Sequence, residues 1–271
     1  MLYILLSVLC SVLIANLLML FGKSGKLNML PIFLGNYFVA SLFSFEAWSH
    51  AQPAISSFDL LFGILAGALF LANFWVYQAS ITYNGLSLSV GVMRVAMIIP
   101  VILAVTVFGE KLKLTGLAGI ALAVAAFALK ADPRELHNFL WLLGLFAVSG
   151  LTDASLKIYK ELGSGAETGF VWVIFSSAFV LTLVSILVGR IRFGYKSLLF
   201  GFALGLPNRL STVFFLKALD KVPAALAYPV VAVSIVALSI ISDLVFWKKK
   251  AQGREILLWS LLLVSLLLLN L

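Results

Sequence analysis

Two segments of the sequence read almost alike: LLFGILAG at residues 60–67 and LLFGFALG at residues 198–205. They lie 138 positions apart, and both carry the spacing G-x-x-x-G, which lets helix backbones pack closely. The same offset aligns VFGE at 107–110 with VFWK at 245–248. A packing motif and a helix end that agree in one register predict an internal repeat. The glycines themselves are predicted to serve packing.

The composition is typical of a membrane protein. Of the 271 residues, 63% are apolar and 11% are charged, and the mean hydropathy is +1.13. Soluble domains are about half apolar and about a quarter charged, so a soluble enzyme domain is excluded. The apolar runs are continuous instead of alternating, which favours helices over a β-barrel.

Ten apolar runs are long enough to be read as spans of about 20 residues. They cover about Leu2 to Gly22, Met29 to Trp48, Phe58 to Ser80, Leu86 to Gly109, Leu114 to Leu129, Asn138 to Ile158, Ala166 to Val188, Ser197 to Leu219, Ala224 to Trp247 and Glu255 to Leu271. We therefore expect an all-α integral membrane protein with ten transmembrane helices.

The repeat divides these helices into five plus five. Residues 1–130 form the first predicted repeat and residues 138–271 the second. Because each repeat has an odd number of spans, the two copies must be inverted relative to each other in the bilayer, as in many secondary transporters.

Several short motifs resemble a known family. FGEKL at 108–112 closes the fourth run, Asn84-Gly85 opens it, Ile99-Pro100 lies inside it, and VPAA at 222–225 leads into the ninth. Together with the repeat, they resemble the drug/metabolite transporter (DMT) superfamily, in particular its ten-helix EamA-type transporters. The resemblance implies a transporter without naming its substrate. The second copy departs from the pattern, since Trp247-Lys248 stands where the first has Gly-Glu.

Ionisable groups inside apolar spans are costly and are therefore candidates for function. Arg94 is the ninth residue of its run, about 12–14 Å from its start at about 1.5 Å per residue. Asn208 and Arg209 directly follow Pro207, which is expected to loosen the helix. All three polar residues are predicted to bind substrate. The alternative is a buried arginine that holds the bundle together.

Asp153 and Lys157 are spaced i, i+4 and can neutralise each other. We expect a structural ion pair between them. The functional alternative is a coupling or charge switch, in which Asp153 binds a proton, or pairs with Arg209 in one state and releases it in another.

Uncharged polar groups supply further candidates. Asn73 and Tyr77 are also spaced i, i+4, with Trp75 and Gln78 beside them, and amide and aromatic groups on one face suit a small polar ligand. Interhelical hydrogen bonding explains them equally well. The same two readings apply to Asn16 and Asn36. Tyr228, next to Pro229, marks a predicted kink near the entrance of the ninth run and a further substrate-binding candidate.

Midspan cations outnumber midspan acids, since Arg94, Lys157 and Arg209 face a single Asp153. This favours an anionic or zwitterionic substrate. The predicted function is a secondary active transporter that works by alternating access, driven by a proton or by the substrate's own gradient, because no nucleotide-binding motif occurs. The alternatives are a flippase or scramblase for a lipid-linked sugar or phosphate, and an exporter of lipophilic drugs. The resemblance disfavours the exporter, because the small four-helix members of the superfamily that expel cationic drugs use a glutamate in their first helix, and the first run here has no acid.

Other classes find no support in the sequence. The lone Cys10 and the distant His50 and His137 predict no metal site and no cofactor, and the scattered cations predict no nucleic-acid binding. No acid, base and nucleophile cluster suggests an enzyme. We expect a multi-pass protein of a bacterial inner membrane, monomeric or homodimeric, with a small-molecule substrate.

The distribution of cations predicts an orientation. Connectors after the odd-numbered runs carry most of the Lys and Arg residues, namely Lys23, Lys26, Lys130, Arg134, Arg190, Arg192, Lys196, Lys248, Lys249, Lys250 and Arg254. The positive-inside rule then places both termini outside the cell. The family resemblance implies both termini inside.

Overall fold

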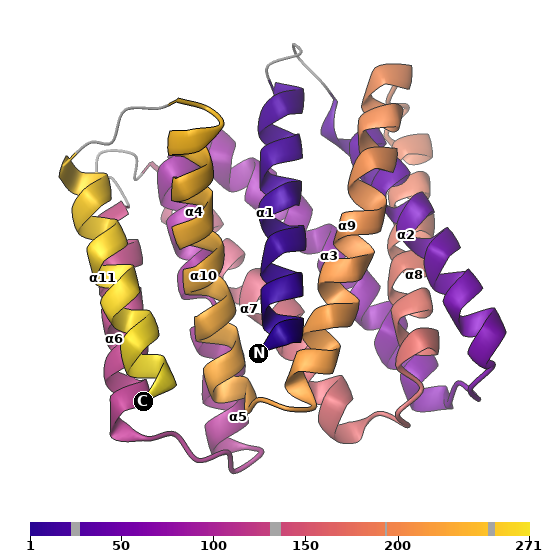
Figure 1. Ribbon diagram of the computed structural model, residues 1–271. Helices are drawn as coiled ribbons and strands as arrows, with labels where there is room; N and C mark the ends of the chain where they lie inside the picture. The colour runs from indigo at the N-terminus through magenta and orange to yellow at the C-terminus, as the bar shows by residue number, and fades with distance from the viewer. Residues whose placement is uncertain (23–27, 131–136, 193, 249–252) are drawn as a thin grey trace. The chain divides into compact units, whose positions relative to one another are not determined.

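The computed structural model describes residues 1–22, 28–130, 137–192, 194–248 and 253–271. Within them the chain forms helices and no strand, so the predicted all-α class is confirmed (Figure 1). The helices are α1 (Leu2–Gly22), α2 (Met29–Ala51), α3 (Ser57–Asn84), α4 (Leu86–Val95), α5 (Ile98–Thr106), α6 (Leu114–Lys130), α7 (Phe139–Leu162), α8 (Glu167–Val188), α9 (Tyr195–Leu219), α10 (Ala224–Val245) and α11 (Gly253–Asn270).

Eight helical segments of the described chain are long and apolar enough to cross a membrane. Two shorter apolar helices, Leu114–Ala128 and Ile256–Asn270, accompany them. A multi-pass α-helical membrane protein is thereby supported by length and composition. The predicted runs agree closely with the helix bounds, except that the fourth run is divided into α4 and α5.

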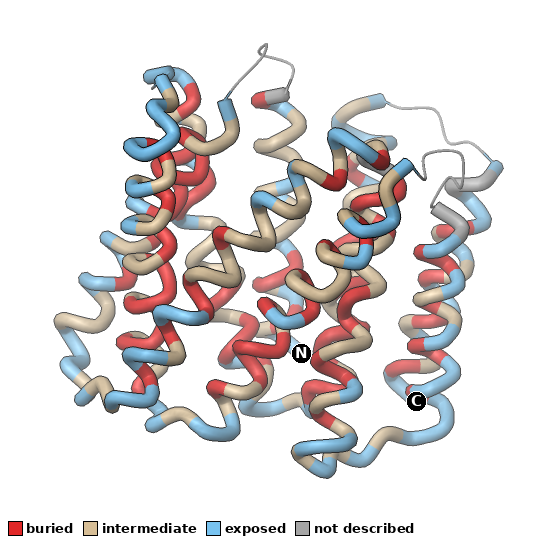
Figure 2. Tube along the Cα trace, turned by 180° about the vertical axis from the view of Figure 1, so that it is seen from behind, coloured by how far each residue is buried: buried red, intermediate tan, exposed pale blue. Residues whose placement is uncertain are grey.

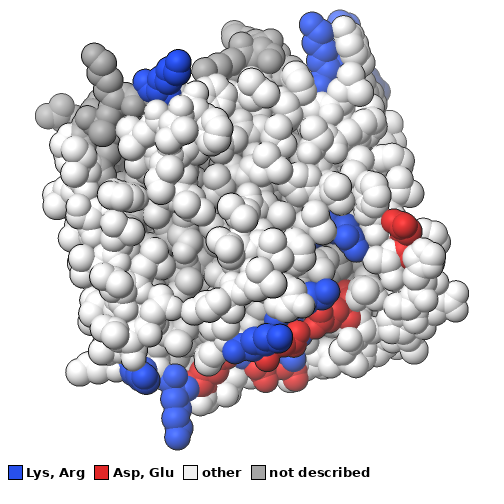
Figure 3. All heavy atoms as spheres, viewed as in Figure 1, with Lys and Arg blue, Asp and Glu red and all other residues white. Residues whose placement is uncertain are grey.

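The helices present apolar side chains outward, which is the reverse of a soluble helix. In α1, Leu5, Leu9 and Leu13 are about half exposed, whereas Ser7 and Val8 are buried. Buried and exposed positions alternate along the helices in Figure 2. Uncharged side chains cover most of the face shown in Figure 3. Such a surface is suited to lipid, because hydrocarbon chains are as apolar as leucine.

The described chain divides into two compact units, and each takes segments from both halves of the sequence. Unit 1 comprises Met1, Ala72–Lys157 and Ala218–Leu271. Unit 2 comprises Leu2–Leu71 and Ile158–Lys217. Helices α3 and α7 therefore contribute to both units.

In unit 2 the two G-x-x-x-G motifs lie at helix contacts, as predicted. A Cβ at Gly201 of α9 would lie 2.9 Å from the Cα of Gly35 in α2, and a Cβ at Gly205 would lie 2.7 Å from the Asn36 carbonyl oxygen. A Cβ at Gly67 of α3 would lie 2.5 Å from the Ile174 carbonyl oxygen of α8. Glycine is required here because the backbones approach too closely for any side chain.

Small hydroxyl groups and aromatic rings complete unit 2. The Ser211 hydroxyl of α9 lies 2.8 Å from the Ser11 hydroxyl of α1 and 3.4 Å from that of Ser7. The rings of Phe21 and Phe200 stack with centroids 4.1 Å apart. Helices α2 and α8 also pack along each other. Shape and hydroxyl contacts therefore bind these helices, as expected where lipid removes the hydrophobic drive for helix association.

In unit 1, α6 and α11 pack along each other, and both contact α10 (Figure 1). The hydroxyl of Ser265 in α11 donates to the Gly119 carbonyl oxygen in α6 at 2.8 Å. The buried Asn84 at the end of α3 accepts the backbone N–H groups of His137 and Asn138, at 3.1 and 2.7 Å. This amide fixes the start of α7 against the end of α3.

The Gly201 contact gives a stability prediction. Gly201→Ala should lower the unfolding temperature of the detergent-purified protein, because overpacking at a close backbone contact costs about 1–3 kcal/mol. Gly144→Ala in α7 is the matched control, since its new Cβ would meet only Val76 at an ordinary 3.6 Å. Alanine gains helix propensity at both sites. Equal unfolding temperatures for the two variants would contradict the packing role.

Candidate functional site

The fourth apolar run is interrupted at its centre. Pro100 has no N–H to donate to the Ala96 carbonyl oxygen, so the regular i to i−4 ladder cannot continue. Instead the Ile99 N–H donates to Ala96 at 3.0 Å and the Met97 N–H donates to Arg94 at 3.3 Å, each only three residues back. Helix α4 ends at Val95 and α5 begins at Ile98. Irregular backbone at this depth is tolerated only where protein or a cavity satisfies it.

Arg94 lies in the last turn of α4, directly before this break. Its Nε is buried and has no hydrogen-bond partner in the described part of the chain. The guanidinium interacts electrostatically with Asp153 of α7 and with Tyr77 of α3. The structure thus brings together three residues that the sequence singled out separately, and all three belong to unit 1.

The face of α7 that carries Asp153 connects further residues to this site. Ser149, Asp153 and Lys157 follow each other at i, i+4 and i+8, so they share a face. The Ser149 hydroxyl donates to Asn73 Oδ1 at 2.6 Å, and the Tyr228 hydroxyl donates to the Asp153 carbonyl oxygen at 2.6 Å. We call this set the Arg94–Asp153 cluster; its members are Asn73, Tyr77, Arg94, Ser149, Asp153 and Tyr228.

The predicted structural ion pair between Asp153 and Lys157 is wrong. Lys157 Nζ lies 2.6 Å from Glu110 Oε1 and 5.2 Å from the centre of the Phe108 ring. The buried ammonium prefers Glu110 because that carboxylate is already held in place by backbone donors, whereas Asp153 faces Arg94. The ion-pair partner of Lys157, Glu110, therefore lies outside the cluster.

Glu110 joins α7 to the start of α10, a role that the sequence analysis missed. Its Oε1 accepts the Ala224 N–H at 3.0 Å and its Oε2 accepts the Ala225 N–H at 2.8 Å, so it caps the first turn of α10. Gly109 before it has a φ of 66°, a conformation that favours glycine. The FGE motif was visible in the sequence, but the partners more than 40 residues away were not.

The environment of Glu110 shifts its titration. Burial opposes ionisation of the carboxyl, but the Ala225 N–H, the Lys157 ammonium and the Ala224 N–H all stabilise the charged form. Together they lower the pKa of Glu110 below its ordinary value of 4.5. A negative charge at a helix N-terminus also complements the helix dipole.

Four other predicted residues lie in unit 2. Asn208 Nδ2 donates to Asn36 Oδ1 at 3.2 Å, and Arg209 Nε donates to the Ser44 hydroxyl at 3.2 Å. Asn16 Nδ2 donates to the Val12 carbonyl oxygen of its own helix. These two hydrogen bonds join α9 to α2, which agrees with the alternative of interhelical hydrogen bonding. Helix α9 runs unbroken through Pro207, and α10 through Pro229.

Trp75 and Gln78 do not join the cluster. Both are exposed, with 54% of Trp75 accessible, although Asn73 and Tyr77 on the same helix turn toward α7 and Arg94. On a helix, positions i and i+2 face different directions, so neighbours in sequence need not share a site. Asp153 and Arg209 belong to different units, and the proposed switch between them stays a prediction.

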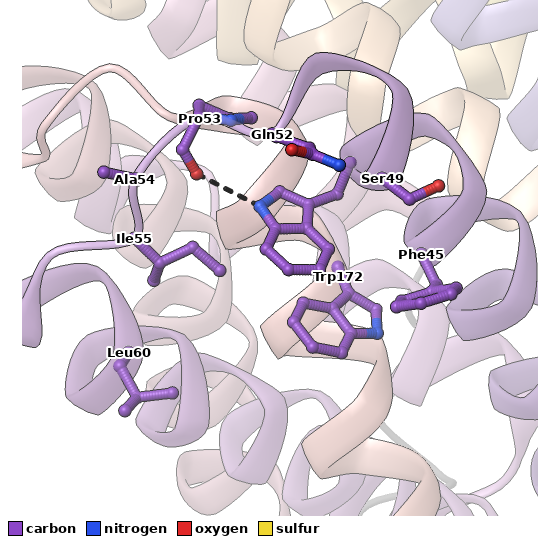
Figure 4. Close-up of a pocket in the computed structure, with 9 residues that line it drawn as sticks. Phe45, Ser49, Gln52, Pro53, Ala54, Ile55, Leu60 and Trp172 are labelled. Carbon is purple, nitrogen blue, oxygen red and sulfur yellow. Dashed lines mark hydrogen bonds between the residues drawn. The ribbon is translucent and has the colours of Figure 1, made fainter.

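An aromatic pocket lies elsewhere in unit 2, with a volume of about 650 Å³ (Figure 4). The Trp48 and Trp172 rings stack with centroids 4.6 Å apart, and Trp48 Nε1 donates to the Pro53 carbonyl oxygen at 3.1 Å. The remaining lining residues are Phe45, Ser49, Gln52, Ala54, Ile55 and Leu60. None is charged, and none was predicted as a site residue. Its two indole rings face each other.

Part of the orientation prediction concerns residues that the structure does not describe. Lys23, Lys26, Arg134, Lys249 and Lys250, together with the side chains of Lys130 and Arg254, lie outside the described residues. In the ranges that are described, no group of three His, Cys, Asp or Glu residues is placed to hold a metal ion.

Comparisons with known proteins find a shared fold and indicate no function. No family model matches the chain. A protein of Haemophilus influenzae, described as an uncharacterized protein, is 26% identical over 230 residues. The match covers 78% of this chain and 77% of that protein. A solved structure described only as "Crystal structure of protein" has a TM-score of 0.79 at 12% identity, covering 99% of this chain and 98% of that chain. The latter similarity shows a shared fold.

The Glu110 contacts predict a pH dependence. Because the pKa of Glu110 is lowered by folding, its stabilising contribution is present above pH 4.5 and is lost as the pH falls through the folded-state pKa. Glu110→Gln should lower the unfolding temperature by a constant amount above pH 4.5, and the difference from the unmodified protein should shrink below it. Glu46→Gln, at an exposed position of α2, is the control. A difference that grows toward acid would contradict this assignment.

Proposed function

We propose that the chain is a secondary active transporter that moves a small polar metabolite, anionic or zwitterionic, across a membrane by alternating access. The observation that carries this proposal is the Arg94–Asp153 cluster at the interrupted α4–α5 segment. Charged groups inside apolar spans mark substrate or ion pathways by default, because burying a charge in lipid is costly. Secondary transporters typically bind substrate where a spanning helix is broken.

The proposal includes ten spans in two inverted repeats, residues 1–130 and 138–271. Corresponding helices make corresponding contacts, which supports this arrangement. The G-x-x-x-G motif of α3 packs against α8, and the matching motif of α9 packs against α2. Helix α4 contacts α6, and α10 contacts α11. Exchanging each helix for its counterpart in the other repeat therefore reproduces the contact.

The ends of the fourth and ninth spans support the repeat as well. Two successive N–H groups, of Val107 and Phe108, donate to the Leu103 carbonyl oxygen, and those of Phe246 and Trp247 donate to that of Ser242. A residue with positive φ follows each, Gly109 at 66° and Lys248 at 51°. The same turn closes both helices, one residue later in the second half than the 138-residue offset of the sequence repeat, although the residues differ.

We further propose that Glu110 forms a closed gate at one end of the cluster. Lys157 lies one helical turn from Asp153 on α7, and Ala224 lies one turn from Tyr228 on α10. Glu110 bonds to both Lys157 and Ala224, so it joins the two helices directly beyond the cluster. Alternating access requires one such closure to open while another forms.

The gate can be tested by cysteine accessibility. In a Cys10→Ser background, Ser149→Cys places a thiol in the cluster, where Ser149 is 3% exposed. Glu110→Gln should speed its reaction with a membrane-impermeant thiol reagent in proteoliposomes, measured well below the unfolding temperature. Glu46→Gln should leave the rate unchanged. Equal rates in the Glu110 and Glu46 variants would contradict the gate.

Transport itself is tested in two steps. Purified protein is screened by thermal unfolding against anionic, zwitterionic and cationic metabolites, because a ligand of the folded state raises the unfolding temperature. Compounds that do so are then supplied as isotope-labelled solutes to proteoliposomes, with and without a proton gradient. We expect saturable uptake of an anion or zwitterion, lost in Arg94→Ala and kept in Arg192→Gln, an exposed position outside the cluster.

Other outcomes would replace the proposal. Stabilisation by lipophilic cations alone, unchanged in Arg94→Ala, would indicate a drug exporter. Movement of labelled lipid between leaflets, without uptake of any soluble compound, would indicate a flippase or scramblase.

A further inference from the structure

Two opposite charges in unit 1 lie near each other without pairing. Arg94 and Asp153 interact electrostatically, yet neither side chain makes an ion pair or hydrogen bond with any described residue. Burying unpaired charges costs several kcal/mol each, and a direct pair would recover part of that cost. A ligand that pairs with both groups would recover that cost for each of them.

The charge balance of the cluster differs from the one that the sequence indicates. Counting midspan residues gives an excess of cations, but the structure neutralises Lys157 with Glu110. Arg209 belongs to unit 2, where its Nε donates to Ser44. Within the cluster one guanidinium thus faces one carboxylate. A ligand that carries only negative charge would leave Asp153 uncompensated and repelled.

The remaining members of the cluster are suited to orient a small ligand. Asn73 accepts from Ser149 through Oδ1, so its two amide N–H groups are the donors that it can offer to a ligand. The Tyr77 hydroxyl lies in the field of Arg94. The Tyr228 hydroxyl is occupied by the Asp153 carbonyl oxygen, so it holds α7 and α10 together instead.

We infer that the Arg94–Asp153 cluster binds a zwitterion, whose carboxylate contacts Arg94 and whose ammonium contacts Asp153. This inference rests on the proposed transport function and narrows it. Arginine is suited to a carboxylate because its planar fork can donate two parallel hydrogen bonds. The chemical class is a compact molecule with both groups a few bonds apart, of which an α-amino acid is the simplest case. Binding neutralises both buried charges at once, so either group alone binds weakly.

The experiment compares a zwitterionic ligand with two analogues, each of which lacks one of its charges. The twenty common amino acids are screened first by thermal unfolding, and the best is compared with its methyl ester, which lacks the carboxylate charge, and with the acid that lacks the amino group. We expect the zwitterion to bind at least about 30-fold more tightly than either analogue, because removing one partner of a buried charge pair commonly weakens binding by that factor. Uptake into proteoliposomes should follow the same order.

Two variants assign the ends of the ligand. Arg94→Gln should reduce affinity for the amino acid and for the deaminated acid, but not for the ester. Asp153→Asn should reduce affinity for the amino acid and the ester, but not for the acid. Arg192→Gln is the matched control. If either variant unfolds, Arg94→Lys and Asp153→Glu, which keep the charges, are assayed for the same order of ligands.

The outcomes separate this inference from the function on which it rests. Saturable uptake of a carboxylate without an amino group, insensitive to Asp153→Asn, would overturn the zwitterion and leave the transporter intact. Equal affinity for all three ligands would also overturn it. Absence of uptake for every anionic and zwitterionic compound would overturn the transporter itself.

Discussion

Satisfying polar groups without water is the constraint on which this structure depends. In the hydrocarbon core each backbone N–H and carbonyl group must find an internal partner, which is why the long apolar segments of the described chain are helical. Charged side chains are subject to the same rule at higher cost. The chain meets it with the ion pair of Lys157 and Glu110 and with donors on the first turn of α10. Against that background, two features stand out: the interruption at Ala96, whose carbonyl oxygen accepts from Ile99 only three residues on, and the buried Arg94 Nε, which has no partner among the described residues.

The sequence predicts the parts of the structure that depend on local pattern. Apolar runs give the helix bounds within a few residues, because a span needs a fixed length of apolar chain. The glycine spacing correctly predicts close contacts, since only small residues permit them. The division of the fourth run was missed, although Pro100 was in view, because proline is often tolerated in a spanning helix: α9 and α10 continue through theirs. Whether a proline breaks a helix depends on what its neighbours supply.

Partner choice between distant residues could not be predicted from spacing. Asp153 and Lys157 stand at the right interval for an ion pair, yet Lys157 pairs with Glu110, 47 residues away in sequence. The i, i+4 rule describes an isolated helix, and tertiary packing overrides it when another carboxylate is held rigidly in place. Asn73 and Tyr77 were selected for their residue types and their spacing, and Arg94 for its depth in an apolar run. The structure adds that all three lie near α7. Trp75 and Gln78 were selected with them and lie apart.

The Gly-Glu pair at 109–110 has no counterpart in the second half, where Lys248 takes the place of Gly109 in the corresponding turn and a lysine follows it in the sequence. Two identical inverted repeats that exchanged conformations would make the two access states equivalent by a two-fold rotation and equal in free energy. Under the proposed transport function, a Glu110 gate present in one half alone would remove that equality and set a resting state. A substrate arriving from the disfavoured side then meets a binding-competent form that is only fractionally populated, and its apparent affinity falls by that fraction. One unmatched side chain is enough to make the two faces of such a transporter bind the same molecule with different strength.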